Sequence, residues 1–440
     1  MSAIMIRALR ATLAVATAAL VGLVPAASLA ADDKPKIDSG DTAWMIVATA
    51  LVLLMSLPGL ALFYAGMVRK KNVLATTAQT LATVALLSVI WVVVGYSLAF
   101  TAGNAVIGDL SRFLMMGMKM DSVHDAAKTV PENVFMMFQL TFAVITPALV
   151  IGAAADRIKF SAMLWFMSLW LLIVYVPIAH WVWGGGFLQK AGVLDFAGGI
   201  VVHINAGIAG LVVALVLKPR RGYPTENMAP HNMVLTVIGV SLLWVGWFGF
   251  NGGSAVAADA RAGMAITVTH VSAATAALAW MFAEWATMGK PSVLGIASGA
   301  VAGLGSITPA SGFVDVGPAL VIGLVAGLAC FYASTTFKRR MGYDDSLDVF
   351  GVHGVGGFIG TVLAGVFATS AIAGADVKGL IEGNGQQVLT QLYGVVCCVA
   401  LSAIGTWVIL KVIDVAIGLR VTPEQEIEGL DINLHGETVH

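Results

Sequence analysis

The sequence predicts an all-α polytopic membrane protein with eleven transmembrane helices, and three observations support this prediction. Hydrophobic residues make up 58% of the 440 residues and charged residues only 11%, whereas soluble domains are roughly 25% charged. The mean hydropathy is +0.89. Eleven apolar segments reach the ~20 residues that a helix needs to cross the hydrocarbon core of a bilayer.

These eleven spans are connected mostly by short loops. We expect them at 43–68, 73–100, 132–155, 160–182, 198–217, 231–251, 262–287, 292–311, 316–337, 349–370 and 387–418. The 49 glycines are typical of helices that pack closely in lipid. The cysteines, Cys330, Cys397 and Cys398, lie within apolar runs and are interpreted as packing residues.

Residues 1–30 have the pattern of a cleavable signal peptide. Arg7 and Arg10 precede a short apolar core at 13–24, and Ser28 to Ala30 form a small-x-small cleavage site. The alternative is a first transmembrane helix, which the short core and the polar stretch after it disfavour. Cleavage would leave the transmembrane domain, 31–418, with its N-terminus outside the cytoplasm.

Basic residues predict the orientation of the spans. With the N-terminus outside, the loops at 69–71, 157–159, 218–221, 290 and 338–340 are cytoplasmic, and these loops hold most of the lysines and arginines. Eleven spans then place the C-terminus inside. The tail, 419–440, is polar and acidic, with too little apolar content for a domain. We interpret it as a cytoplasmic docking or regulatory segment.

Two stretches share one outline in which an aspartate precedes a mid-span histidine by eight residues. Asp195 precedes His203 in the fifth span, and Asp345 precedes His353 in the tenth. Spans five apart run in opposite directions, as in an inverted repeat of helices 1–5 and 6–10. Eight residues rise about 12 Å, so each histidine would reach the middle of the membrane from its own side.

A lone intramembrane histidine is usually a structural residue that hydrogen-bonds a neighbouring helix. Here the repeat and the flanking glycines favour a functional pair, His203 with His353. No mid-span carboxylate cage for a metal cation is apparent. The midplane therefore suits a small species that crosses uncharged, or one whose proton a histidine handles.

Aromatic residues gather at the outer ends of the third, fourth and sixth spans. One explanation of this gathering is an interfacial belt, which most tryptophans at span ends form. A cluster of rings beside a serine hydroxyl can instead hold a small cation, at roughly 0.5–2 kcal/mol per ring. The cluster contains Phe138, Gln139, Phe142, Tyr175, Trp181, Trp183, Trp244, Trp247, Phe250, Asn251 and Ser254. It predicts a cation-selective vestibule with a phenylalanine constriction below it.

Other classes of function are disfavoured. The net charge of −1 indicates no nucleic-acid surface. The sequence has neither a phosphate-binding loop of an ATP-driven pump nor a nucleophile elbow. We therefore expect no enzyme activity, no catalytic residue, no cofactor and no metal.

The sequence resembles the Amt/Mep/Rh ammonium transporter family, in its bacterial Amt branch, over about 41–437. Several ordered blocks carry the resemblance. They are FYAGMVRKKN at 63–72, GAAADRIKF at 152–160, HWVWGGG at 180–186, DFAGGIVVHINAG at 195–207, GWFGFNGGSA at 246–255 and DDSLDVFGVHGVGG at 344–357.

The resemblance implies roles for individual residues. Trp183, Ser254, Phe138 and Phe142 correspond to an outer ammonium-recruitment site, which Asp195 supports structurally. Phe142 and Phe250 correspond to a phenylalanine gate, His203 and His353 to twin pore histidines, and Trp247 and Tyr175 to pore-lining aromatics. It also implies a homotrimer in the bacterial inner membrane, with a PII-type signalling protein at its cytoplasmic face.

The expected function is to recruit NH4⁺ (or methylammonium, its analogue), to deprotonate it and to conduct NH3, with or without a relayed proton. Two alternatives stay open. One is an ammonium sensor that signals through its tail, although no effector domain is attached. The other is a channel for a neutral gas or solute, which would not need the aromatic vestibule.

Overall fold

The computed structural model describes residues 36–439, and residues 37–439 form one compact helical unit. The predicted signal peptide, 1–30, lies outside the described residues. Within them the predicted all-α membrane fold is confirmed, with a single two-stranded hairpin as the exception.

Ten helical segments in the described part are long and apolar enough to cross a membrane. They are Ser39–Met67, Lys70–Phe100, Glu132–Ala154, Phe160–Lys190, Gly199–Leu217, Met233–Gly253, Ala260–Met288, Val316–Met341, Phe350–Phe367 and Gln386–Ile417. Each overlaps an expected span. The remaining expected span, 292–311, corresponds to the shorter apolar helix Val293–Ile307.

Most of these segments are built from several helical pieces. The α-helices are α2 (Ser39–Leu54), α3 (Ala61–Met67), α4 (Val73–Ile90), α5 (Tyr96–Phe100), α6 (Glu132–Ala154), α7 (Phe160–Trp170), α8 (Val176–Trp183), α9 (Phe187–Lys190), α10 (Asn205–Leu217), α11 (Met233–Gly253), α12 (Ala260–Met288), α13 (Val293–Ile307), α14 (Val316–Tyr332), α15 (Lys338–Met341), α16 (Val355–Phe367), α17 (Ser370–Ala373), α18 (Gln386–Ile417) and α19 (Pro423–Glu428).

Wider π-helical turns join many of these pieces. They are η1 (Met55–Leu60), η3 (Trp91–Gly95), η5 (Leu171–Tyr175), η6 (Gly199–Ile204), η7 (Ala333–Phe337), η8 (Phe350–Gly354) and η10 (Asp431–His435). Three short 3₁₀ turns are η2 (Lys70–Asn72), η4 (Phe113–Met115) and η9 (Leu380–Glu382). The hairpin pairs β1 (Val123–His124) with β2 (Ala127–Pro131), antiparallel.

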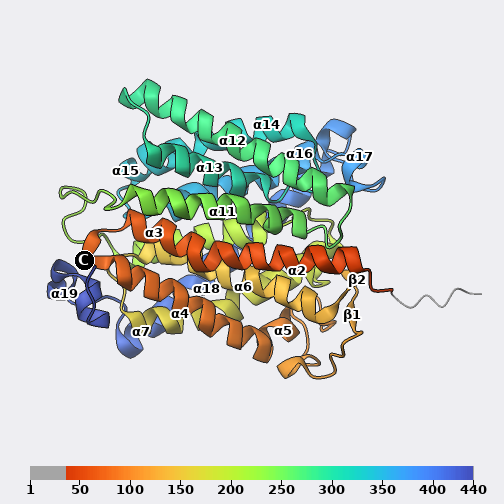
Figure 1. Ribbon diagram of the computed structural model, residues 1–440, viewed down its shortest axis with the longest axis horizontal. Coiled ribbons are helices and arrows are strands. Elements are labelled where there is room, and N and C mark those ends of the chain that lie inside the picture. Colours follow the sequence, from red (N-terminus) through yellow and green to blue (C-terminus); the bar gives the residue numbers. More distant parts are fainter. Residues whose placement is uncertain (1–35, 440) are drawn as a thin grey trace, which may run out of the picture. The chain divides into compact units, whose positions relative to one another are not determined.

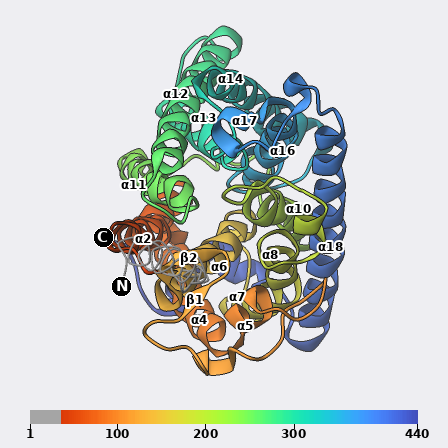
Figure 2. The ribbon, with the colours of Figure 1, turned by 90° about the vertical axis from the view of Figure 1, so that its right-hand side faces the viewer.

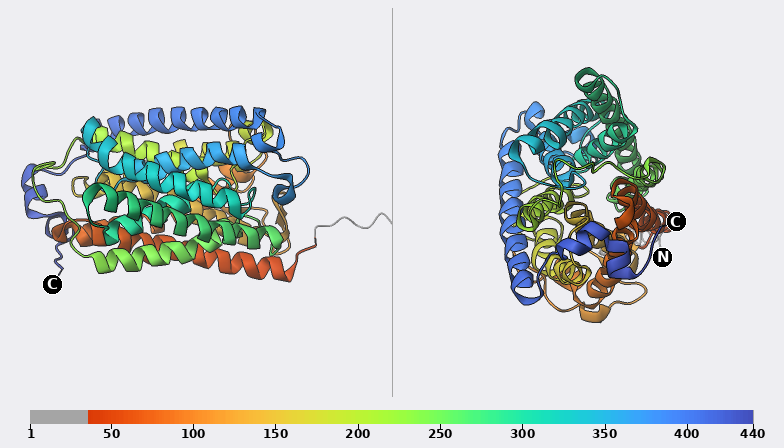
Figure 3. Two further views of the ribbon diagram at one scale, coloured as in Figure 1. Left: turned by 90° about the horizontal axis from the view of Figure 1, so that it is seen from above. Right: turned by 90° about the vertical axis from the view of Figure 1, so that its left-hand side faces the viewer.

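The long helices lie side by side, and their connections gather at two ends (Figures 1 and 2). One end, which we name the tail end, carries α15 and α19. The other, the hairpin end, carries β1, β2 and α17. Helix α18 runs along one side of the bundle for its whole length (Figure 3). The long helices therefore run between these two ends.

Close packing of small residues holds the helices together. A Cβ added at Gly299, Gly303, Gly323 or Gly327 would lie 2.5–2.8 Å from atoms of α12, so α13 and α14 approach α12 at glycine positions. Such close approach is how helices associate in lipid, where burial of apolar surface gives no driving force between them. Large apolar side chains such as Phe282, Leu324 and Val415 are exposed, as suits a surface in contact with lipid.

Candidate functional site

Three cavities within the described residues follow one another from the hairpin end to the tail end. The Trp183 pocket, of about 170 Å³, lies at the hairpin end, and the Asp348 pocket, of about 160 Å³, lies at the tail end. Between them lies the histidine cavity, of about 10 Å³, which has room for about one water molecule.

Shared and touching residues connect these cavities. Phe142 lines the Trp183 pocket and Phe250 the histidine cavity, and their ring centroids are 4.3 Å apart. His353 and Phe63 line both the histidine cavity and the Asp348 pocket. A path between the two ends therefore passes the phenylalanine pair first and the histidine pair second.

The two predicted histidines meet inside the bundle. The Nδ1 atoms of His203 and His353 are 3.2 Å apart, and the rings are tilted by only 11°. Both side chains are buried. Since a nitrogen–nitrogen hydrogen bond needs one donor and one acceptor, one Nδ1 carries the proton and the other accepts it. Among the described residues Nε2 of His203 has no partner, so it is available to a species in the cavity.

Each histidine lies in a π-helical turn, His203 in η6 and His353 in η8. Single π turns inside α-helices often occur at functional sites. The two helices cross at glycines, because a Cβ on Gly207 would lie 2.2 Å from the backbone nitrogen of Gly354. This crossing brings the rings into contact.

Aspartates begin both histidine helices, as predicted. The Asp195 carboxylate accepts backbone N–H groups of residues 198–201 at 2.6–3.1 Å, and Asp345 accepts the N–H of Phe350 at 2.7 Å. Burial raises the pKa of Asp195 to about 6, although these four donors oppose the shift. Asp195 adjoins the Trp183 pocket through Phe196, and Asp345 adjoins the Asp348 pocket through Ser346. The two helices therefore start at opposite ends of the bundle.

Three of the four residues expected in the outer recruitment site line the Trp183 pocket. They are Phe142, Trp183 and Ser254. The Trp183 ring meets Phe142 edge-on at 5.7 Å, and its Nε1 donates to the Asp195 carbonyl at 2.8 Å. The Ser254 hydroxyl donates to the carbonyl of Phe250, so its oxygen lone pairs stay available to accept an N–H group.

Phe138 and Tyr175 occupy different places from those expected. Phe138 does not line the Trp183 pocket. Its ring packs behind Phe142, with centroids 5.0 Å apart. Tyr175 lines none of the three cavities and packs edge-on against Trp91 at 6.3 Å. Trp247 does line the histidine cavity, where it stacks on His203 at 5.5 Å.

Gln139, which the sequence placed in the aromatic cluster without a role of its own, is a residue of the Trp183 pocket. It lines the Trp183 pocket, is 8% exposed, and its Oε1 has no partner among the described residues. A buried amide oxygen without a partner costs free energy unless a ligand or water supplies an N–H or O–H. Its position between Phe138 and Phe142 was the only available signal.

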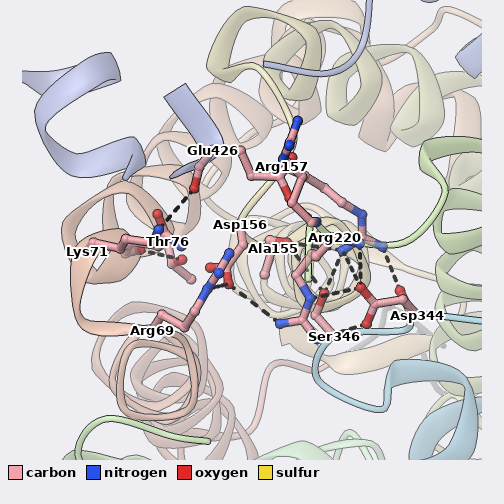
Figure 4. A network of polar contacts seen from close by, with 12 residues as sticks. Arg69, Lys71, Thr76, Ala155, Asp156, Arg157, Arg220, Asp344, Ser346 and Glu426 are labelled. Carbon is pink, nitrogen blue, oxygen red and sulfur yellow. Dashed lines mark hydrogen bonds and ion pairs between the residues drawn. The ribbon is translucent and has the colours of Figure 1, made fainter. Parts of the chain in front are cut away.

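A buried charge network joins four connecting segments at the tail end (Figure 4). Asp156 binds Arg69 at 2.9 Å and Arg220 at 3.5 Å, and Arg220 binds Asp344 at 2.8 Å. Arg157 donates to the backbone of Asp344 at 2.6 Å. Burial would raise the pKa of Asp344, but the Arg220 guanidinium holds it below its ordinary value. The network fixes the loops around the Asp348 pocket.

The tail packs across the helix ends at this same end (Figure 3). Glu426 accepts the N–H of Arg221 at 2.7 Å and pairs with Arg420, also at 2.7 Å. Asp431 accepts the N–H of Ala75 in the first turn of α4 at 2.8 Å. Lys71 donates to the backbone carbonyls of the tail residues Glu426 and Ile427. The tail is therefore ordered on the bundle by specific contacts.

Comparisons with known proteins agree with this geometry. A sequence profile of the Ammonium Transporter Family matches residues 43–440. The ammonium transporter of Aquifex aeolicus is 49% identical over 414 residues, which cover 94% of this chain and 96% of that protein. The crystal structure of Saccharomyces cerevisiae Mep2 superposes with a TM-score of 0.82 at 36% identity, covering 88% of this chain and 89% of that one. A structure titled Sensor Amt Protein gives a TM-score of 0.83 at 29% identity, covering 90% and 98%.

Proposed function

Because the chain belongs to the ammonium transporter family, we propose that it recruits NH4⁺ in the Trp183 pocket, deprotonates it and conducts NH3 through the histidine cavity. The observation that carries this proposal is the order of the cavities. A pocket lined by aromatic rings leads to a phenylalanine pair and then to a narrow cavity with two histidines.

The Trp183 pocket suits a small cation that can donate hydrogen bonds. The faces of Trp183 and Phe142 attract a positive charge, and the Ser254 hydroxyl and Gln139 amide oxygens can accept N–H groups. A metal cation of the same charge would gain the ring contacts without the directional hydrogen bonds. Asp195 supports the site from behind, through the backbone of its helix and the Trp183 indole.

The histidine cavity disfavours an intact cation. Its lining is almost entirely apolar, its volume is about 10 Å³, and a charge in such surroundings is expensive. The ammonium ion therefore gives up a proton before it passes Phe142 and Phe250. That proton either returns to water in the Trp183 pocket or passes along His203 and His353, and NH3 regains a proton beyond His353.

The wider setting follows from the charges and from the family. We propose that the tail end is cytoplasmic, since the basic loops 69–71, 157–159, 218–221 and 338–340 gather there. The N-terminus then lies outside, and the first ten of eleven crossings form the inverted repeat of helices 1–5 and 6–10. We further propose cleavage near residue 30, a homotrimer in the bacterial inner membrane, and a PII-type protein that binds at the Asp348 pocket.

Ammonium pulses on proteoliposomes adsorbed to a solid-supported membrane test the mechanism. A relayed proton gives a transient current, and purely electroneutral NH3 passage gives none while uptake persists. We expect His203→Ala and His353→Ala each to abolish the current. Variants that keep both current and methylammonium uptake unchanged would refute the relay.

A sensor role is the second candidate, favoured by the likeness to the Sensor Amt Protein and by the docked tail. Removal of residues 419–440 separates the two functions. A transporter whose tail regulates opening should lose or change uptake without these residues. A pure sensor should keep wild-type uptake and lose only its ammonium-dependent response in the cell.

A further inference from the structure

His180 is a buried histidine one turn before Trp183 in α8, and it lines none of the three cavities described above. Its side chain is 0% exposed. Nδ1 lies 2.9 Å from the carbonyl oxygen of Ala99, and Nε2 lies 2.8 Å from that of Asn104. A carbonyl oxygen accepts hydrogen bonds and never donates them. Both ring nitrogens of His180 therefore face acceptors.

These two contacts require two ring N–H groups. A neutral imidazole has only one, so its other nitrogen would place a lone pair against a carbonyl oxygen. Turning the ring over would put carbon atoms at these positions, far closer than the ~3.3–3.6 Å of C–H···O contacts. The imidazolium form of His180 satisfies both carbonyls with charge-assisted hydrogen bonds.

Two helix ends favour a positive charge at this ring. His180 lies in the last turn of α8, and Ala99 lies in the last turn of α5, which continues the helix that begins at Val73. The C-terminal end of a helix carries a partial negative charge from its free carbonyl groups. The ring thus lies where two such ends converge.

No carboxylate of residues 36–439 forms an ion pair with the His180 ring, so carbonyl groups alone balance the charge. The helical elements that pack most closely against α8 are α5, η5, η6 and α9, and the adjoining loops carry Asp109 and Asp195. The titratable residues of these helical elements are Tyr96, Tyr175, His203 and Lys190. Tyr96 donates to Glu132, and Glu132 pairs with Arg112. Neither Tyr96 nor Glu132 hydrogen-bonds the His180 ring.

His124 provides an internal contrast. Its Nε2 lies 2.7 Å from the carbonyl oxygen of Phe100, whereas its Nδ1 accepts the N–H of Ala126 at 3.1 Å. One donor and one acceptor describe a neutral imidazole. Two histidines that bind adjacent residues of α5, His180 and His124, therefore require different protonation states.

The His180 contacts belong to a clamp that holds the segment carrying Trp183. The indole of Trp181 donates to the carbonyl of Val106 at 2.9 Å, and the N–H of Phe187 donates to that of Ala105 at 3.0 Å. With the two bonds of His180, four hydrogen bonds fasten residues 99–106 to residues 180–187. Trp183 lies between these attachment points.

Resting on the proposed function, we propose that His180 is a buried imidazolium and a positioning residue of the ammonium pocket. Its two hydrogen bonds clamp residues 99–106 onto α8 and so fix the Trp183 ring over the bound cation. His180 itself does not touch the substrate. Its charge is structural, because a neutral ring could donate to only one of the two carbonyl groups.

Nitrogen-15 NMR of the histidine-labelled protein in lipid bilayers tests the protonation state directly. With carbon-13 also in the alanine and asparagine carbonyls, the His180 ring is identified by its through-space correlation to Ala99 and Asn104, so the wild type suffices. At about pH 7 we expect two protonated ring nitrogens for His180 and one for His124. An unprotonated nitrogen in His180 would overturn the proposal, whether or not the protein transports ammonium.

Methylammonium uptake in proteoliposomes tests the positioning role. His180→Gln keeps a single donor nitrogen, and we expect its KM to rise about tenfold with a smaller change in kcat. His124→Gln keeps one donor and one acceptor, so its KM should stay at the wild-type value. Equal KM values for the two variants would overturn the role.

A second variant covers the case in which His180→Gln does not fold. Trp181→Phe removes one of the four hydrogen bonds at a half-buried position, and its KM should rise about threefold. An unchanged KM for Trp181→Phe would count against the clamp. Absence of uptake in the wild type would instead refute the proposed function and leave the NMR result standing.

Discussion

Replacing Gly207 by alanine tests whether the histidine pair depends on the close crossing of α10 and η8. A Cβ at position 207 would lie 2.2 Å from the nitrogen and 2.3 Å from the Cα of Gly354, and backbone atoms cannot rotate away. Ordinary Cβ contacts begin at 3.4 Å, so the two helices must separate by about 1.2 Å. Because His353 directly precedes Gly354, the 3.2 Å contact with His203 should stretch beyond hydrogen-bonding distance.

The assay is ammonium-evoked current together with methylammonium uptake in proteoliposomes. We expect the current to be lost and uptake to fall about tenfold or more, because a displacement near 1 Å can cost ~100-fold in rate. The same overpacking should lower the free energy of unfolding by about 1–3 kcal/mol. Size-exclusion chromatography of the purified variant separates a folded, inactive protein from an unfolded one.

Gly263→Ala is the matched control. Gly263 lies in α12, and an added Cβ there meets nothing within 4 Å. Its current and uptake should equal those of the wild type, with stability unchanged or higher by up to about 1 kcal/mol. Wild-type current and uptake in Gly207→Ala would refute the dependence of function on the crossing.

The remaining predictions concern the Trp183 pocket, the phenylalanine pair and the tail-end network. Gln139→Leu removes an acceptor that has no partner in the protein, so it should raise the KM for methylammonium about fivefold at similar kcat. An unchanged KM would show that Gln139 does not bind the cation. Phe250→Ala removes one ring of the pair in which the centroids of Phe142 and Phe250 are 4.3 Å apart, so potassium pulses should evoke currents that the wild type lacks. If potassium pulses evoke no current in this variant, the pair is not a barrier to ions. Burial would raise the pKa of Asp344, but Arg220 holds that pKa below its ordinary value. The Asp344 carboxylate therefore stabilises the fold fully above about pH 4, and this stabilisation is lost as the pH falls through the lower pKa of the folded state. The melting temperatures of the wild type and Asp344→Asn should therefore differ at neutral pH and converge only in acid, and convergence near about pH 6 would contradict this assignment.

The histidine helices show what the sequence could predict. The two Asp-to-His outlines identified both helices, and the expected contact between His203 and His353 is present at 3.2 Å. The π-helical turns that hold these residues were not predictable. A π turn arises where tertiary packing outweighs the local preference for an α-helix, and here that packing comes from a crossing 150 residues away in the chain.

Phe138 and Phe142 show a limit of periodicity. Their spacing places them on one face of α6, which the 5.0 Å contact between their rings bears out. Which of them reaches the pocket depends on how α6 is rotated against α11. Phe138 lies against Gly253, since a Cβ at that glycine would be 2.7 Å from its ring. Phe142 is left to face Trp183.

The tail shows a limit of composition. Its acidic, polar sequence predicted a docking or regulatory segment but not where it docks, and Glu426 and Asp431 are 2% and 3% exposed. Besides Arg420, which pairs with Glu426, their partners are backbone N–H groups of Arg221 and Ala75, which every sequence contains and no composition reveals. Val421 and Leu430 add a small apolar contact with Ala75. The docking of the tail therefore depends on which helix ends the fold leaves open.

The π turns make the pore sensitive to chain length as well as to residue type. Helix η6 begins directly after Gly198, so deleting one of its residues would allow a regular α-helical turn to form but would shorten the link between Asp195 and the helix by one residue. The Asp195 carboxylate could then no longer accept the same four backbone N–H groups that hold the start of the His203 helix. Insertions and deletions between Asp195 and His203, or between Asp345 and His353, should consequently be more damaging than most substitutions there. Relatives that keep both histidines are expected to align through these two stretches without gaps.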